Sequence, residues 1–222
     1  MSSLLLKYNY PQVVFAKELK AWLKSRSKNY HLIIDCPCGN GETPWHLSGI
    51  PGVKIIAADI SESAIHNAKQ NFSAPNIDYR INTLEAILAS EKKFDAFCIV
   101  NSLFLLENYD PILKQLKISA AENRADVMII IPDTEGKNFK WFQSQNTNEN
   151  KLILPEKEIE TFFTKYGFKV QKIKPICYTH HYGRNDVKLF SVFWTLYLGF
   201  LNRIQTAFKI GKPNYFLIAL SA

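Results

Sequence analysis

A short motif with two glycines follows the first strongly apolar run of the chain. The run Tyr30–Asp35 leads directly into Asp35-Cys-Pro-Cys-Gly-Asn-Gly41. Because Gly39 and Gly41 carry no side chain, a turn built on them lets backbone N–H groups come close to a ligand. Twenty residues after Gly39, Asp59 ends the next apolar run, where a carboxylate can accept hydrogen bonds from a ribose diol. The spacing therefore predicts a nucleotide-type site.

The same residues also have a purely structural interpretation. In it the glycines only make a tight turn, and Asp59 caps a helix that starts at Ser61. The ordered set of strand, glycine turn, helix, strand and acid favours the ligand site, because a lone Gly-x-Gly is a weak signal and the whole set is not. Thr43 is predicted to cap the intervening helix, with Pro44 in its first turn.

Short apolar runs rich in β-branched residues repeat along the chain, separated by helix-like stretches. The predicted strands are 30–35, 53–59, 77–81, 94–100, 125–131, 168–173 and 215–220. The predicted helices are 11–26, 61–72, 110–118 and 155–166, the last closed by Gly167. Alternation of this kind predicts an α/β fold with a doubly wound, mainly parallel sheet. Residues 143–150 are all polar and predict a surface loop.

Composition restricts the class of protein. A chain of 222 residues with 47% hydrophobic and 21% charged residues is a globular domain, not a disordered or collagen-like chain. The net charge of +7 suits an acidic partner, but it is spread too evenly to indicate a specific nucleic acid. Four cysteines are too few for a disulfide scaffold, they lack zinc-site spacing, and they favour a reducing compartment. No signal peptide is recognised, so we expect a cytoplasmic location.

The glycine motif resembles motif I of the class I S-adenosylmethionine-dependent methyltransferases, usually Asp-x-Gly-x-Gly-x-Gly. Pro37 stands where the first glycine is usual. Asp59-Ile60-Ser61 resembles the second motif of the same family. A dinucleotide fingerprint, in contrast, needs a third glycine at the position that Pro44 occupies.

The resemblance implies a cofactor site for S-adenosylmethionine, whose product is S-adenosylhomocysteine. Gly39 and Gly41 would admit the carboxypropyl end of the cofactor, and Asp35 would meet its amino group. Asp59 would bind the ribose, and Ile60 would pack on the adenine. The implied set is Asp35, Pro37, Cys38, Gly39, Gly41, Asp59, Ile60, Asn82, Thr83, Asn101 and Ser102. Asn82 and Thr83 stand where the family commonly has an acid, which this chain lacks.

The resemblance covers residues 30–222 and implies a seven-stranded sheet with an antiparallel last strand. We expect one domain over 1–222, in which 1–29 form an N-terminal helical arm. Residues 30–135 would be the cofactor-binding half. Residues 136–222 would be the substrate half, with a helical insert at 186–210 before the last strand.

The residues at the end of the predicted fourth strand restrict the chemical class of the methyl acceptor. Amide and base methylases resemble Asn/Asp-Pro-Pro-Phe/Tyr there, whereas this chain reads Asn101-Ser-Leu-Phe104. We therefore expect methylation of a small or lipid/glycan-linked molecule, on oxygen. His180 or His181 could take the hydroxyl proton, because histidine titrates near neutral pH. The alternative is that both are solvated or capping residues of a loop.

Two other interpretations of the whole chain stay open. The chain could be an inactive S-adenosylmethionine-binding scaffold or partner subunit, or an NAD-type oxidoreductase. No metal site is expected. Residues 189–202 are uncharged and rich in aromatics, so 187–210 could be a lid over a lipid-like substrate or contact a membrane peripherally. A helix that covers the sheet or a dimer contact is favoured over these, and the oligomeric state stays open.

Overall fold

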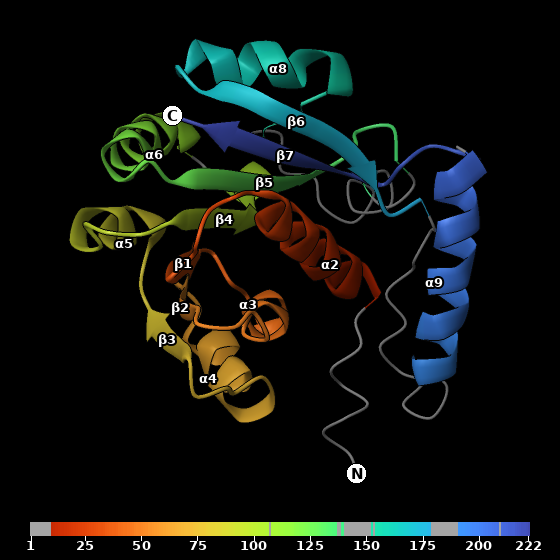
Figure 1. Ribbon diagram of the computed structural model, residues 1–222, viewed down its shortest axis with the longest axis horizontal. Coiled ribbons are helices and arrows are strands. Elements are labelled where there is room, and N and C mark those ends of the chain that lie inside the picture. The colour runs from red at the N-terminus through yellow and green to blue at the C-terminus, as the bar shows by residue number, and fades with distance from the viewer. Residues whose placement is uncertain are drawn as a thin grey trace.

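A computed structural model describes residues 10–106, 108–136, 139, 152, 154–178, 191–208 and 210–222, apart from the side chains of 10 and 191–196. These residues form one seven-stranded sheet in the order β3-β2-β1-β4-β5-β7-β6 (Figure 1). The strands are β1 (Leu32–Asp35), β2 (Lys54–Asp59), β3 (Ile77–Ile81), β4 (Ala96–Val100), β5 (Asp126–Pro132), β6 (Lys169–Ile176) and β7 (Tyr215–Ser221). β1 to β5 pair in parallel, and β7 runs antiparallel to both β5 and β6. The predicted fold class is confirmed.

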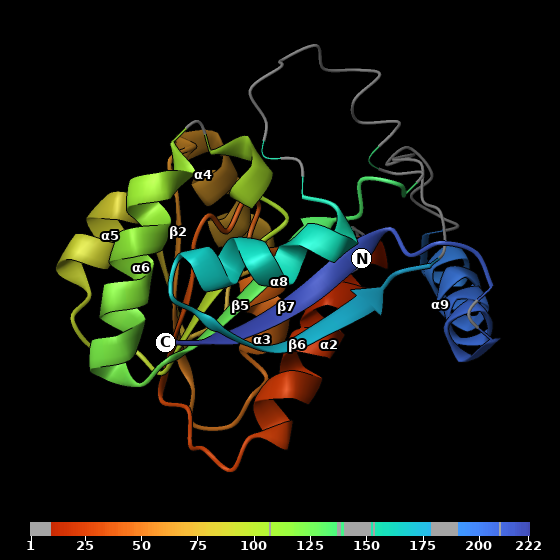
Figure 2. The ribbon, with the colours of Figure 1, turned by 90° about the horizontal axis from the view of Figure 1, so that it is seen from above.

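Helices cover both faces of this sheet (Figure 2). Side chains of α2 (Tyr10–Ser25), α3 (Glu42–Leu47) and α4 (Glu62–Asn71) join one buried cluster. Those of α5 (Leu84–Ser90), α6 (Tyr109–Asn123) and α8 (Glu156–Lys165) join the cluster on the other face. A short 3-10 turn, η1 (Leu103–Leu105), follows β4, and α9 (Ser191–Phe208) lies between β6 and β7 in the chain. Among the described helices, none is both long and apolar enough to cross a membrane.

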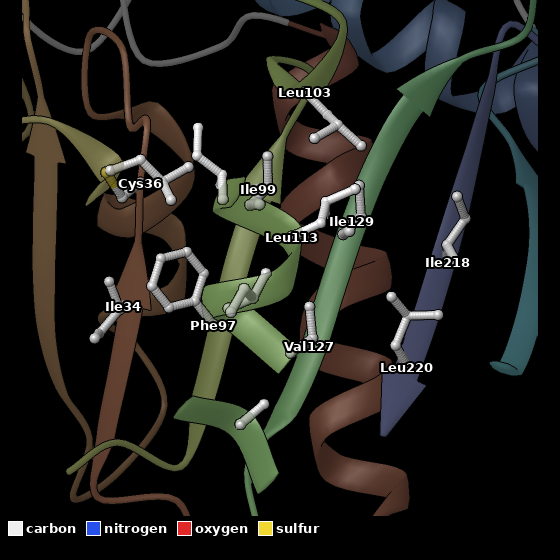
Figure 3. Packing of buried hydrophobic residues seen from close by; sticks show 14 of the residues in the cluster. Ile34, Cys36, Phe97, Ile99, Leu103, Leu113, Val127, Ile129, Ile218 and Leu220 are labelled. Atoms are coloured by element: carbon white, nitrogen blue, oxygen red, sulfur yellow. The ribbon is translucent and has the colours of Figure 1, made fainter. Parts of the chain in front are cut away.

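Alternate residues of the central strands point to opposite faces, and both faces are buried. Figure 3 shows one such face, where Ile34, Phe97 and Val127 from three neighbouring strands belong to the same buried cluster as Leu113 of α6. The intervening residues of the same strands, such as Ile33 and Cys98, are buried with the α2 side. Burial on both faces is the reason that these strands read as continuous apolar runs in the sequence.

Two helix starts differ from the sequence-based expectation. The residue that caps α3 is Gly41, not Thr43, so the predicted cap is wrong. The Thr43 hydroxyl instead donates to Gln12 Oε1 at 2.8 Å, which ties α3 to α2. α5 was not predicted; it starts after Thr83, whose Oγ1 accepts a hydrogen bond from Ala86 N at 3.1 Å. The predicted loop 143–150 lies outside the described residues.

Candidate functional site

The glycine motif forms a loop between the carboxyl ends of β1 and β2. Cys38 N donates to Ala58 O at 2.8 Å and Gly41 N donates to Cys38 O at 3.2 Å, so the loop is held against β2. Pro37 follows a cis peptide bond, and both Pro37 and Cys38 are partly exposed. Gly39 (φ 52°) and Gly41 (φ 85°) have left-handed backbones, the conformation that glycine adopts most readily.

The two glycines differ in what surrounds them. A Cβ added to Gly41 would lie 2.6 Å from Ala68 Cβ and 2.7 Å from the Tyr79 hydroxyl. A Cβ added to Gly39 would have no described heavy atom within 4 Å. Gly41 therefore allows α4 and β3 to pack closely on the loop, whereas Gly39 borders open space that a ligand could enter.

Asp59, at the end of β2, joins three segments of this edge. Its Oδ2 accepts from Gly39 N at 2.8 Å and its Oδ1 accepts from Ser61 N at 2.9 Å. Its backbone oxygen accepts from Asn82 N at 3.0 Å, after β3. Each carboxylate oxygen has a second lone pair, so these bonds leave acceptor capacity for a hydroxyl group. Asp59 thus joins the loop to Ser61, which itself caps α4 in place of the Asp59 cap that the structural interpretation expects, and Asp59 can still serve a ligand.

Asp35 is the most unusual group at this edge. Its side chain is fully buried, and neither carboxylate oxygen has a hydrogen-bond partner among the described residues. Burial, and after it the charge of Asp59, raises the pKa of Asp35 well above its ordinary value. Burial also raises the pKa of the neighbouring Cys36 thiol, and the charges of Asp35, Asp59 and Glu85 raise it further. The interior end of the site is therefore surrounded by the carboxyl groups of Asp35, Asp59 and Glu85, although the whole chain carries +7.

Asn101 and Ser102 follow β4, the strand that neighbours β1 on the other side. Asn101 has a left-handed backbone (φ 53°), and its N–H donates to Ile130 O of β5 at 2.8 Å. Ser102 is buried, and its hydroxyl has no hydrogen-bond partner among the described residues. Because Asp35 pairs in register with Cys98 of β4, both unpartnered groups belong to the same region of the carboxyl edge.

The candidate adenine-binding residues divide into apolar and polar members. Ile60 is 73% exposed directly after Asp59. Ile81, which pairs in register with Asp59 at the end of β3, is 56% exposed, and sequence reasoning missed it. The only sequence signal is an isoleucine at a strand end, just before Asn82. Asn82 Oδ1 accepts from Thr83 N at 3.0 Å, and the Thr83 hydroxyl caps α5, so both side chains already have local partners.

Farther along the same edge, beyond β4 and β5, lies a small depression with a mainly apolar lining. The residues that line it are Phe104, Ile131, Pro132, Thr134, Phe139, Leu152 and Leu154. Phe104 and Phe139 contact each other edge to face, with their ring centroids 6.5 Å apart. Sequence reasoning singled out only Phe104 of this set, because the others come from separate segments.

The predicted catalytic histidines His180 and His181 lie outside the described residues. Among the described residues, no group of three or more His, Cys, Asp or Glu side chains is arranged to hold a metal ion. Among the described residues, Cys36, Cys38 and Cys98 are free thiols.

Comparison with known proteins finds a matching family model for part of the chain and several similar structures. Residues 33–120 match the family model described as a methyltransferase domain. The plantazolicin methyltransferase BpumL in complex with SAH has a similar structure (TM-score 0.62, 17% identity, covering 96% of this chain and 84% of that chain). So does a possible histamine N-methyltransferase from Thermotoga maritima (TM-score 0.61, 14% identity, 97% and 91% covered).

A third similar structure is magnesium protoporphyrin IX methyltransferase (ChlM) from Synechocystis PCC 6803 with bound SAH. Its TM-score is 0.58 at 11% identity, with 93% of this chain and 80% of that chain covered. None of the curated proteins compared with the chain matches it.

Proposed function

The chain has the fold of the class I S-adenosylmethionine-dependent methyltransferases, and we propose that it binds S-adenosylmethionine and transfers its methyl group to a small or lipid/glycan-linked acceptor. The site would lie where the glycine loop, Asp59 and the end of β4 meet. S-adenosylhomocysteine would be the product. We further propose that the methylated atom is an oxygen.

The observation that carries this proposal is the buried, unpartnered carboxylate of Asp35. A buried charge without a partner is strongly destabilising, and a cation that enters the site would relieve it. S-adenosylmethionine carries an ammonium group and a sulfonium centre, so its charge complements Asp35 and Asp59. The residues present therefore fit this cofactor.

The same charges disfavour a dinucleotide. In a dinucleotide-binding fold the pyrophosphate lies at the N-terminus of the helix after the first strand. Here that helix is α3, and Glu42 lies in its first turn. The negative charge of a pyrophosphate would be repelled by Glu42 and by the nearby Asp35 and Asp59. The NAD-type oxidoreductase is therefore less favoured than the methyltransferase.

The remaining contacts follow from the edge geometry. Gly39 would admit the carboxypropyl end of the cofactor, since a side chain there would occupy the open space. The free lone pairs of Asp59 would accept from the ribose hydroxyls. Ile60 and Ile81 would provide apolar surface for the adenine ring, because both are exposed beside Asp59.

Bound S-adenosylmethionine would supply an electrophilic methyl group, and the chain would supply position and proton removal. The acceptor would lie at this carboxyl edge beside the end of β4, because the depression beyond β4 and β5 has room for only about one water-sized group. Asn101 and Ser102, at the end of β4, would border the methionine half of the cofactor. We propose that His180 or His181 takes the proton of an acceptor hydroxyl.

Calorimetric titration of S-adenosylmethionine and S-adenosylhomocysteine tests the cofactor site. We expect micromolar binding to wild type and a loss of about tenfold or more, about 1.4 kcal/mol, in both Asp35→Asn and Asp59→Ala. Asp78→Asn is the matched control, because Asp78 is an exposed carboxylate of β3 that pairs with Arg80. Absence of heat with both ligands, in folded protein free of co-purified cofactor, would refute the methyltransferase proposal, and binding of NAD would replace it.

An enzyme and an inactive scaffold would both bind S-adenosylmethionine, but only the enzyme would transfer its methyl group. Wild type that binds the cofactor should transfer a labelled methyl group from S-adenosylmethionine to an acceptor in cell extract, and His180→Ala/His181→Ala should transfer less. Cofactor binding without transfer in any extract would instead identify the scaffold.

A further inference from the structure

The helix α9 exposes large apolar side chains along one side. Phe200 is 61% exposed and Phe208 is 74% exposed, with the partly buried Ile204 midway between them. A spacing of four and eight residues places these three side chains on one face of an α-helix. Ile210, just beyond the helix, is 53% exposed and extends the apolar surface.

This exposed face is not the face that contacts the rest of the protein. Leu198 is only 3% exposed and belongs to the buried cluster on the α2 side. Asn202, one turn later, accepts a hydrogen bond from Tyr178 N at 2.7 Å through its Oδ1. Leu198 and Asn202 therefore mark the inner side of α9. Of the two favoured interpretations of this segment, a helix that covers the sheet does not account for Phe200 and Phe208, and a dimer contact is weighed below.

The sequence around α9 is also basic, although one of its cations, Lys212, pairs with Glu135 from an earlier segment. Residues 187–213 contain four Lys or Arg and no Asp or Glu. Arg203, within the helix, is exposed beside the apolar face. Exposed aromatic side chains on one face, joined to cations without acids, are the pattern of a helix that lies in the interface of an anionic membrane.

The helix α9 lies on the same side of the molecule as the candidate cofactor site. β5 and β6 both point toward the side of the molecule where α9 stands (Figures 1 and 2). The glycine loop and the apolar depression also lie at the carboxyl ends of the parallel strands. A partner that docked on the exposed face of α9 would therefore lie on the same side of the protein as the carboxyl edge, where we place the acceptor.

We propose that α9 docks this protein on an anionic lipid membrane, with Phe200 and Phe208 inserted among the headgroups and Arg203 near the lipid phosphates. Charge favours this partner over a second copy of the chain. In a two-fold symmetric dimer the same surface meets itself, and the sequence 187–213 contains no acid that could pair with Arg203 of the second copy. The proposal does not depend on cofactor binding, and it gives a route by which a lipid-linked acceptor would reach the carboxyl edge.

Sedimentation with vesicles tests the docking. Vesicles of phosphatidylcholine alone are compared with vesicles that contain about one third phosphatidylserine or phosphatidylglycerol. We expect wild type to bind the anionic vesicles and to release them as salt is raised. Phe200→Ser/Phe208→Ser should weaken binding about tenfold or more, and Arg203→Gln about fivefold. The matched control is Ile118→Ser on α6, where Ile118 is 53% exposed far from α9 in the chain.

Three results would overturn the proposal. One is equal binding of wild type to neutral and anionic vesicles, and another is unchanged binding of the Phe200→Ser/Phe208→Ser variant. The third is a wild type that is dimeric in light scattering and binds no vesicles, together with a Phe200→Ser/Phe208→Ser variant that is monomeric. A second copy of the chain would then cover α9. Circular dichroism and cofactor titration of each variant show whether the fold and the site are intact, so a failure of docking stays distinct from a failure of the methyltransferase proposal.

Discussion

Alanine substitutions at the two loop glycines should separate packing from ligand access. Both glycines have a left-handed backbone, which costs a residue with a Cβ about 1 kcal/mol. At Gly41 the new methyl group also meets Ala68 and Tyr79 at 2.6 Å and 2.7 Å, and overpacking of this kind costs about 2 kcal/mol more. We therefore expect Gly41→Ala to destabilise the protein by about 3 kcal/mol and Gly39→Ala by about 1 kcal/mol.

Thermal unfolding without ligand measures these changes. For a domain of this length, 1 kcal/mol lowers the Tm by about 2–4 °C, so we expect losses of about 6–12 °C for Gly41→Ala and about 2–4 °C for Gly39→Ala. Cofactor titration should give the opposite order, with the larger loss of affinity in Gly39→Ala, because its methyl group points into open space. Equal losses of Tm in the two variants, or a larger loss of affinity in Gly41→Ala at a temperature where it is folded, would refute the assignment of the two roles.

Three further outcomes follow from individual side chains. The raised pKa of Asp35 means that ionisation of this carboxyl group costs stability in the folded state. Ligand-free Asp35→Asn should therefore gain stability over wild type as pH rises above about 4, the pKa of an unfolded aspartate. Urea unfolding at pH 4 and pH 7 measures this, and an equal gain at both pH values would contradict it. Burial, and to a lesser extent Lys20, lowers the pKa of His46 to about 4, so its imidazole NMR signals should titrate near pH 4 and shift little in Lys20→Gln. Phe97 is fully buried and stacks edge to face on Phe94, so Phe97→Ala should lower the free energy of unfolding by about 3–5 kcal/mol in urea titration, and a loss below 1 kcal/mol would show that this core position is not packed as described.

Sequence patterns predicted the sheet because its strands are buried on both faces. Residues 127–131 form a run without a polar residue, and most of β5 (Asp126–Pro132) follows from that property alone. The antiparallel position of β7 came from the family resemblance and not from periodicity. α5 was missed because Thr83 stood as a candidate ligand residue, and a threonine side chain can serve either a ligand or a helix start.

The candidate site was only partly predictable, because its decisive contacts join residues far apart in the sequence. Motif spacing identified Gly41, but the reason for that glycine is its approach to Ala68 and Tyr79. Likewise Asp35 was chosen as a motif position, and only the packing around it reveals a carboxylate without a partner. For α9 the sequence left a lid or a membrane contact open, and it favoured a helix covering the sheet or a dimer contact, since aromatic side chains at helical spacing usually indicate a core.

The order of strands has a consequence for synthesis on the ribosome. β6 pairs only with β7 in the sheet, and β7 lies between β6 and β5. β1 to β5 are complete by Pro132 and can pair as they emerge, whereas β6 and α8 have no strand to join until residues 215–221 are made. Until then β5 presents an unpaired apolar edge, which is the kind of surface that chaperones bind and that promotes aggregation. The sheet is therefore closed by insertion of its last-made strand between two older ones, and the interval before that insertion is when the nascent chain is most exposed to misassembly.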